Sequence, residues 1–208
     1  MGITPLGETW RRVEEFHSQI NAEPAAGRPP RTSLFHTLVD VLETVVFAIV
    51  LFVGINAVST RIRVDGSSME PTLHNNELVI VNKLAYKLTK PRLGDVIVFR
   101  KPSEPDEEYI KRVIGVAGDR IEVSQGQVFV NGQRLEEPYI AASPNYPGSW
   151  TVPAGALFVL GDNRNDSSDS HTWGPVPVKS VIGKAVFVYW PPEQWGVIAH
   201  AVQAAAGD

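Results

Sequence analysis

The chain has 208 residues, a formal net charge of -4 and no cysteine. This length accommodates one ordinary domain together with an anchor and tails. The absence of cysteine excludes disulfides, cysteine nucleophiles and thiolate metal sites, and the net charge gives no reason to expect a nucleic-acid partner. The histidines lack the i, i+4 spacing that places two metal ligands on one helical face. We therefore expect no metal and no cofactor.

Residues 1–33 are predicted to form an N-terminal cytoplasmic extension and linker. Apolar residues recur at helical spacing between Thr9 and Ile20, which indicates either a short amphipathic helix or a loose extension. Asn21 to Arg31 contains prolines and a glycine, which break helices. That segment is therefore interpreted as a flexible linker.

Residues 34–58 are largely apolar and predict one transmembrane helix. At about 1.5 Å per residue the segment is roughly 37 Å long, which exceeds a hydrocarbon core of about 30 Å. Asp40 and Glu43 fall in its first three turns, where an interfacial depth limits their cost. A cleaved signal peptide is the alternative, but this stretch is longer than a typical signal-peptide apolar region and begins far from the N-terminus. We favour a permanent single span.

Arginines flank the predicted span unequally. Four precede it (Arg11, Arg12, Arg28, Arg31) and two follow it (Arg61, Arg63). Because cytoplasmic flanks carry the excess of positive charge, this bias favours a cytoplasmic N-terminus and a following domain on the outer or lumenal side.

From residue 59 to 192 the pattern changes to short alternating runs separated by Gly, Pro, Asn and Asp. This pattern predicts a mostly β domain built from antiparallel sheets. Asn131-Gly132 between two such runs predicts a hairpin, because both residues tolerate positive φ. Residues 193–208 are expected to be a C-terminal tail, with a short surface or interfacial helix over 195–206 as the alternative.

Two reactive side chains stand out in the β domain. Ser68 follows closely on the predicted span, and a serine nucleophile needs a base to accept its proton. Lys111 precedes Arg112 in an alternating strand, so one of these cations must turn toward the apolar face or lie at its edge. A lysine in such surroundings loses hydration, and its pKa falls toward the range in which the neutral amine acts as a base. The ordinary interpretation is a solvated lysine at a strand edge.

A third segment, residues 161–171, is too polar for a core element. As an ordinary loop it would be a turn capped by its own Asx and Ser side chains. As part of a site it would supply hydroxyls and carboxylates that orient an amine. The loop by itself leaves both interpretations open.

Four segments occur together in the order and setting of one enzyme family: Ser68-Met69-x-Pro71-Thr72, Gly94 to Phe99, Tyr109 to Asp119, and Gly161-Asp162-Asn163-Arg164. Over about residues 40–192 they resemble the type I signal peptidase (leader peptidase) family. His171 and the Trp190-Pro191-Pro192 ending resemble thylakoid-type members. Compared with larger relatives, the segment at about 119–157 is short, so we expect a small hairpin insertion there.

The resemblance implies a Ser/Lys dyad, with Ser68 as nucleophile and Lys111 as general base. It also implies that the Ser167 hydroxyl hydrogen-bonds the lysine and that Asp169 supports the loop. The Ser68 N–H is the expected oxyanion donor. Some family members add a serine hydroxyl two residues before the nucleophile, where this chain has Gly66, and a Gly66 backbone contact is the nearest substitute.

The family cleaves after small residues, in the A-x-A pattern. By motif position the pocket walls would be Ile62, Val64, Met69, Leu73, Val79, Val98, Tyr109 and Ile110, although each fits an ordinary core position equally well. The extended substrate is expected to add a strand. The implied partners are signal peptides of presecretory proteins and the lipid bilayer, with the export machinery as a further candidate. The implied location is the plasma membrane or the thylakoid membrane.

Two other functions fit parts of the sequence. A Ser/Lys self-cleaving repressor-type peptidase shares the β scaffold, but the apolar span and the absence of a DNA-binding helix pair argue against it. A non-catalytic, membrane-anchored β domain that binds exported proteins would require Ser68 and Lys111 to be present by coincidence.

Overall fold

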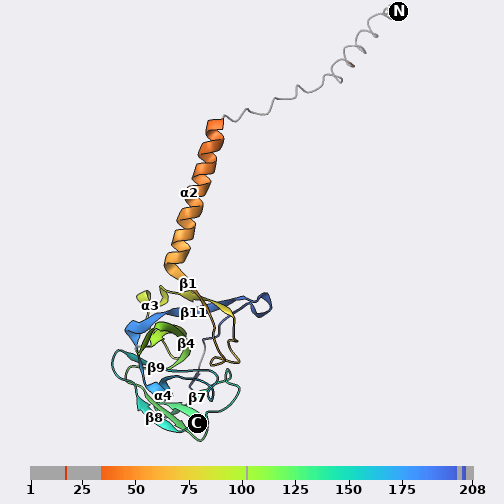
Figure 1. Ribbon diagram of the computed structural model, residues 1–208. Coiled ribbons are helices and arrows are strands. Elements are labelled where there is room, and N and C mark those ends of the chain that lie inside the picture. Colours follow the sequence, from red (N-terminus) through yellow and green to blue (C-terminus); the bar gives the residue numbers. More distant parts are fainter. Residues whose placement is uncertain (1–16, 18–33, 102, 201–202, 205–208) are drawn as a thin grey trace, which may run out of the picture. The chain divides into compact units, whose positions relative to one another are not determined.

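The computed structural model describes residues 17, 34–101, 103–200 and 203–204 (Figure 1). Apart from residue 17, the predicted N-terminal extension and linker lie outside the described residues. The chain divides into two units, residues 1–49 and residues 50–208.

The apolar stretch forms one long helix, as predicted: α2 (Leu34–Val58). Among the described residues it is the one helix that is long and apolar enough to cross a membrane. None of its residues is buried within the described structure. Its apolar side chains therefore need a covering that the described chain does not supply, and a lipid core provides it.

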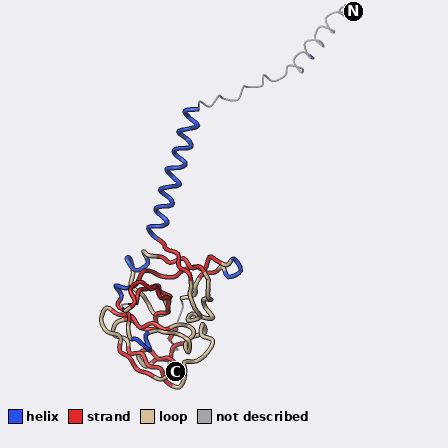
Figure 2. Tube along the Cα trace, viewed as in Figure 1, coloured by secondary structure: helices blue, strands red, loops and turns tan. Residues whose placement is uncertain are grey.

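Strands and loops make up most of the chain after α2 (Figure 2). The larger sheet has the order β1 (Ser59–Arg63), β2 (Leu78–Asn82), β11 (Val181–Trp190), β3 (Val96–Lys101), β4 (Glu104–Val116), β9 (Ala156–Leu160) and β10 (Val176–Pro177), and β12 (Gly196–Val197) pairs with β11. All of these pairings are antiparallel. The mostly β, antiparallel fold that the sequence predicts is confirmed.

A second sheet has the order β13 (Gln203–Ala204), β7 (Gln133–Glu136), β6 (Gln127–Val130), β5 (Arg120–Ser124) and β8 (Gly148–Thr151). Asn131 and Gly132 form the β6–β7 turn with positive φ. The segment at about 119–157 therefore holds four strands, where we expect only a small hairpin. The tight turns between β5, β6 and β7 allow this short segment to build most of a sheet.

The short helical elements are α3 (Ala85–Leu88), α4 (Ser170–Trp173) and the 3-10 turns Val178–Ser180 and Pro192–Gln194. The described part of the expected C-terminal tail is packed rather than loose. Its β12 residues pair with β11, Ile198 is buried in the core, and β13 pairs with β7. Strands of two residues carry no periodic pattern, so the sequence does not indicate them.

Buried side chains from the loop between β1 and β2 join those of the larger sheet in one hydrophobic cluster. It contains Val64, Met69, Leu73, Val79, Val81, Val96, Val98, Ile110, Ala185, Val188 and Ile198. This cluster anchors the chain on both sides of Ser68 and includes Ile110 of β4. The core therefore holds the two segments that carry Ser68 and Lys111.

Candidate active site

Ser68 lies in a turn that is fixed at both ends. The Val64 N–H donates to the Glu77 carbonyl (2.8 Å) and the Asn76 N–H donates to the Val64 carbonyl (2.8 Å), which closes the loop. Gly66 has a φ of 86°, a left-handed conformation that favours glycine. Buried side chains before and after Ser68 anchor the turn to the core. Such a turn presents the hydroxyl in one place.

The polar loop after β9, residues 161–171, forms hydrogen bonds with the turn that carries Ser68. The Asn163 N–H donates to the Ser68 carbonyl (3.1 Å), and the Asn163 side-chain amide donates to the Ser67 carbonyl (3.2 Å). The Ser67 hydroxyl donates to Asp166 (2.6 Å). Gly161 approaches so closely that a Cβ there would overlap the Ser68 carbonyl oxygen. The loop thus holds the backbone of the turn directly at Ser68.

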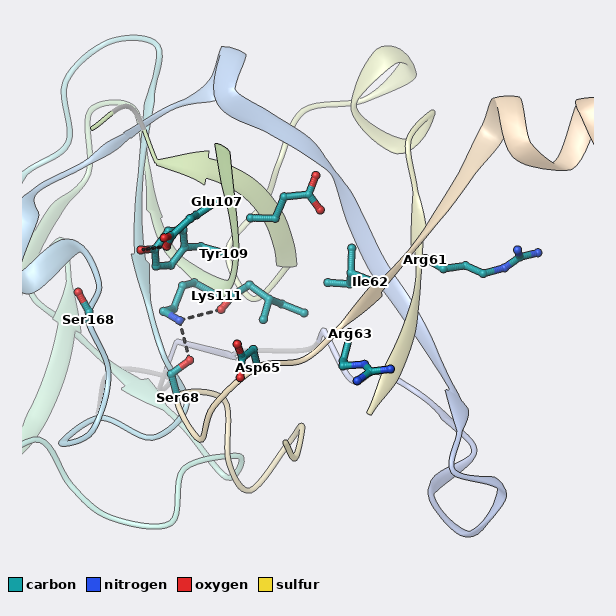
Figure 3. Close-up of a pocket in the computed structure, with 11 residues that line it drawn as sticks. Arg61, Ile62, Arg63, Asp65, Ser68, Glu107, Tyr109, Lys111 and Ser168 are labelled. Carbon is teal, nitrogen blue, oxygen red and sulfur yellow. Dashed lines mark hydrogen bonds between the residues drawn. The ribbon is translucent and has the colours of Figure 1, made fainter. Parts of the chain in front are cut away.

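Lys111 brings its amine from β4 to the Ser68 hydroxyl. Its Nζ lies 2.7 Å from Ser68 Oγ and 3.0 Å from the Ile110 carbonyl oxygen (Figure 3). The residue is 3% exposed. Burial lowers the pKa of Lys111 from 10.5 to about 8, while the negative charges of Asp169 and Asp162 act in the opposite direction. A lysine with this pKa has a substantial neutral fraction near physiological pH, about one molecule in ten at pH 7.

Arg112 is buried as well, on the opposite side of the strand. The alternation predicts that one of the two adjacent cations turns toward the apolar side or lies at its edge, but the structure buries both. Arg112 makes a bidentate pair with Asp162 (2.8 and 2.7 Å) and donates to the carbonyls of Gly94 and Ala199. The carboxylate compensates the buried charge of the arginine. In the part of the chain that the structure describes, Lys111 donates to neutral acceptors only, the Ser68 hydroxyl and the Ile110 carbonyl.

Asp169 is fully buried and organises the polar loop. It accepts from the Gly161 N–H (2.9 Å), from the His171 N–H (3.2 Å) and from His171 Nδ1 (2.7 Å). The His171 ring stacks on Tyr146, with 3.9 Å between ring centroids. Asp169 therefore lies where a loop-supporting carboxylate is predicted, and its role stays a prediction.

The Ser167 hydroxyl is buried close to Ser68 but has no hydrogen-bond partner among the described residues. The hydrogen bonds of Lys111 go to Ser68 and Ile110. The bond between Ser167 and the lysine that the resemblance implies is therefore not formed in this structure.

The N–H groups near the nucleophile differ in their availability. The Ser68 N–H donates to no group among the described residues. The Gly66 N–H donates to Asn75 Oδ1 (3.0 Å). The expected substitute donor at Gly66 is therefore engaged, because the Asn75 side chain folds back over the turn. The second oxyanion donor is not supplied by this N–H in the observed arrangement.

The comparison with known proteins can now be set beside this geometry. Residues 38–190 match the family described as "Signal peptidase, peptidase S26". The chain belongs to the type I signal peptidase family. A signal peptidase I of Leptolyngbya laminosa is 43% identical over 184 residues, which cover 84% of this chain and 89% of that protein.

Further relatives support the assignment. A probable signal peptidase I-2 of Synechocystis sp. is 40% identical over 178 residues, which cover 82% of each chain. Thylakoidal processing peptidase 1 of Arabidopsis thaliana is 37% identical over 142 residues, which cover 63% of this chain and 42% of that protein. The signal peptidase is a serine endopeptidase that removes signal peptides from exported proteins. Neither the repressor-type peptidase nor the non-catalytic binding domain fits this assignment.

A cleft of about 500 Å³ opens beside Ser68 and Lys111 in the signal peptidase. One wall comes from β1 and the residues after it, and the other from β4. The lining residues are Arg61, Ile62, Arg63, Asp65, Ser68, Glu107, Glu108, Tyr109, Ile110, Lys111 and Ser168 (Figure 3). The reactive pair thus lies in a cleft between two strands.

The predicted pocket residues of the signal peptidase fall into two groups. Ile62, Tyr109 and Ile110 line the cleft. The others, Val64, Met69, Leu73, Val79 and Val98, are buried in the hydrophobic core. They pack in one cluster with Ile110, against which Ile62 also packs, so they support the lining residues from behind.

Sequence reasoning missed several polar contacts of the site. Asp166 bonds Ser67 across 99 positions of the chain, and no local pattern indicates such a contact. Asn163 stands inside a motif that the sequence singles out, but its two bonds to the nucleophile turn are tertiary. Among the described residues, no group of three or more His, Cys, Asp or Glu side chains is placed to hold a metal ion.

Proposed function

We propose that this signal peptidase cleaves its substrates with a dyad in which Ser68 is the nucleophile and Lys111 the general base. The observation that carries the proposal is the 2.7 Å contact between Lys111 Nζ and Ser68 Oγ at a lysine that is 3% exposed. This distance allows direct proton transfer, and burial favours the neutral amine that accepts a proton.

The reaction follows from this geometry in two stages. Neutral Lys111 takes the proton of the Ser68 hydroxyl while the oxygen attacks the peptide carbonyl carbon. The ammonium then returns the proton to the leaving amine as the peptide bond breaks, which leaves an ester on Ser68. In the second stage Lys111 takes a proton from water, the resulting hydroxide attacks the ester, and the proton returns to Ser68.

The negative charge that develops on the carbonyl oxygen needs donors. The unengaged Ser68 N–H supports a role as the first donor. Because the Gly66 N–H is bonded to Asn75, a second donor has to come from a rearranged turn or from another group. A substitution of Asn75 would therefore show whether the Gly66 N–H can act as the second donor once it is released.

We further propose that the substrate enters the cleft as an extended strand between β1 and β4. Ile62 and Ile110 face the cleft from the two walls, and both belong to or pack against the same core. A peptide between two strands gains main-chain hydrogen bonds while alternate side chains enter pockets. Small residues before the cut fit a lining backed by such a close-packed core.

The location proposed for the peptidase is a plasma or thylakoid membrane. Helix α2 would be a single span with a cytoplasmic N-terminus, as the surplus of arginines before it favours. The catalytic domain would then lie on the outer or lumenal side, where it meets translocated signal peptides. The bilayer and the export machinery are the other proposed partners.

The proposal is tested with the full chain in detergent and a presecretory protein that carries an A-x-A site. We expect Ser68→Ala and Lys111→Ala each to lower kcat at least about 1,000-fold. The exposed residues Ser149 and Lys179 provide matched controls, and Ser149→Ala and Lys179→Ala should keep wild-type rates. Wild-type rates in either site variant would refute the dyad.

A further inference from the structure

Tyr109 forms part of the cleft wall directly beside the proposed dyad. It lies two positions before Lys111 on β4, so both side chains are on the same face of the strand. The Lys111 amine is 5.9 Å from the centroid of the Tyr109 ring. The position of this ring therefore limits the space next to the bond that is cut.

Two carboxylates hold the outer end of the ring. The Tyr109 hydroxyl donates its one proton to a pair of acceptors, Glu104 and Glu107, with 3.0 Å to the Glu107 carboxylate oxygen. Figure 3 shows Glu107 next to Tyr109 at the cleft. Glu104 is held in turn by Lys101 at 2.8 Å. The bond to Glu104, burial and the bond to Glu107 keep the pKa of Tyr109 well above its ordinary value, so the phenol keeps its proton and remains a donor.

The faces of the same ring are also occupied. Phe99, its cross-strand neighbour on β3, stacks on it with 6.1 Å between centroids and 25° between planes. The Lys101 amine lies 5.7 Å from the ring centroid. The ring is thus fixed by its faces and by its hydroxyl, and it cannot swing out of the cleft without losing the bonds to Glu104 and Glu107.

We propose that Glu104 and Glu107 are positioning residues that set the size limit for the substrate side chain next to the cut bond. Neither carboxylate bonds Ser68 or Lys111. Glu104 lies outside the cleft lining and reaches the cleft through the ring, and Glu107 both lines the cleft and holds the ring. A larger substrate side chain has to displace the ring, and the hydrogen bond that the phenol shares between Glu104 and Glu107 opposes this displacement. The inference rests on the proposed function, because it requires the peptide to occupy this cleft.

The experiment compares kcat/KM for two presecretory substrates that differ only in the residue before the cut, alanine in one and valine in the other. In Glu104→Ala/Glu107→Ala we expect the alanine-to-valine ratio to fall about tenfold, because cleavage after valine accelerates relative to cleavage after alanine. Glu104→Gln/Glu107→Gln should keep most of the ratio, since an amide oxygen still accepts the phenol proton.

Tyr109→Phe keeps the ring and removes its hydroxyl, so it should lower the ratio as the double alanine variant does. Combining all three changes should lower it no further, because the carboxylates act through the hydroxyl. The control Glu122→Ala/Glu136→Ala removes the same charge from the second sheet and should keep the wild-type ratio.

A wild-type ratio in Glu104→Ala/Glu107→Ala would overturn the inference. The inference would also be overturned if adding Glu104→Ala/Glu107→Ala to Tyr109→Phe lowered the alanine-to-valine ratio again by the same factor. The carboxylates would then act independently of the ring. Failure of the proposed function has a different signature, since Ser68→Ala would then still cleave the alanine substrate. A thermal unfolding midpoint equal to that of the wild type shows that the double variant is folded.

Discussion

The lowered pKa of Lys111 predicts how the rate depends on pH. With a pKa of about 8, about one lysine in ten is neutral at pH 7, against roughly one in 3,000 at the ordinary value of 10.5. Burial therefore increases the population of the reactive base about 300-fold. We expect kcat/KM to rise about tenfold per pH unit up to about pH 8 and to level off above it.

The assay measures kcat/KM from about pH 6 to about pH 10.5, with a substrate that lacks titratable residues near its cleavage site. In Asp169→Asn the rising part of the pH–rate profile should move to lower pH, because the Asp169 charge raises the pKa of Lys111. Lys111→Arg should be inactive throughout, since a guanidinium does not lose its proton. A rate that still rises steeply beyond about pH 10 would refute the desolvation argument.

Three further changes test the packing around the dyad. The pKa of Lys111 is lower in the folded state than in the unfolded state. Below pH 8 the charged lysine therefore lowers the free energy of unfolding by about 3 kcal/mol, and this stability returns as the pH rises to 10.5. Lys111→Met should therefore be about 1–2 kcal/mol more stable than wild type at pH 7 after its lost hydrogen bonds are counted, and urea unfolding at pH 7 and 10.5 checks that the difference narrows. Glu137→Ala leaves the buried Arg164 guanidinium without its bidentate partner and should lower the free energy of unfolding by about 3–5 kcal/mol, measured by urea denaturation. Gly161→Ala pushes a methyl group into the Ser68 carbonyl and should lower kcat more than 100-fold while KM changes less, which steady-state kinetics would show.

Periodicity predicts the larger features of this fold. The apolar run predicts α2 because a helix of that composition can be covered by lipid, and alternation with turn residues predicts antiparallel strands. The Asn131-Gly132 turn is also predictable from the sequence, because both residues tolerate positive φ. The packing of Ile198 and the pairing of β13 cannot be predicted from the sequence, because they depend on surfaces formed by strands far away in the chain.

The site is predictable only in part. Ser68 and Lys111 can be named because their motifs occur together, and the structure brings their reactive atoms within 2.7 Å. Alternation cannot tell which inward positions face an open cleft and which face closed core. Motif position in the family, which names Val64 and Met69 as pocket walls, does not tell either, and both are buried in the core. The bond between Ser67 and Asp166 depends on the meeting of two loops.

The neighbouring cations Lys111 and Arg112 differ in their partners, and this difference supports the proposed role of the lysine as a base. Both are buried, but the Asp162 carboxylate is held in a bidentate pair with Arg112. Asp169, the other carboxylate that raises the pKa of the lysine, is bonded to His171 and to the Gly161 N–H. If either carboxylate bonded the lysine instead, the ammonium form would be stabilised and the base lost. The proposed dyad therefore requires that these carboxylates be paired elsewhere, as much as it requires the short distance from Lys111 to Ser68.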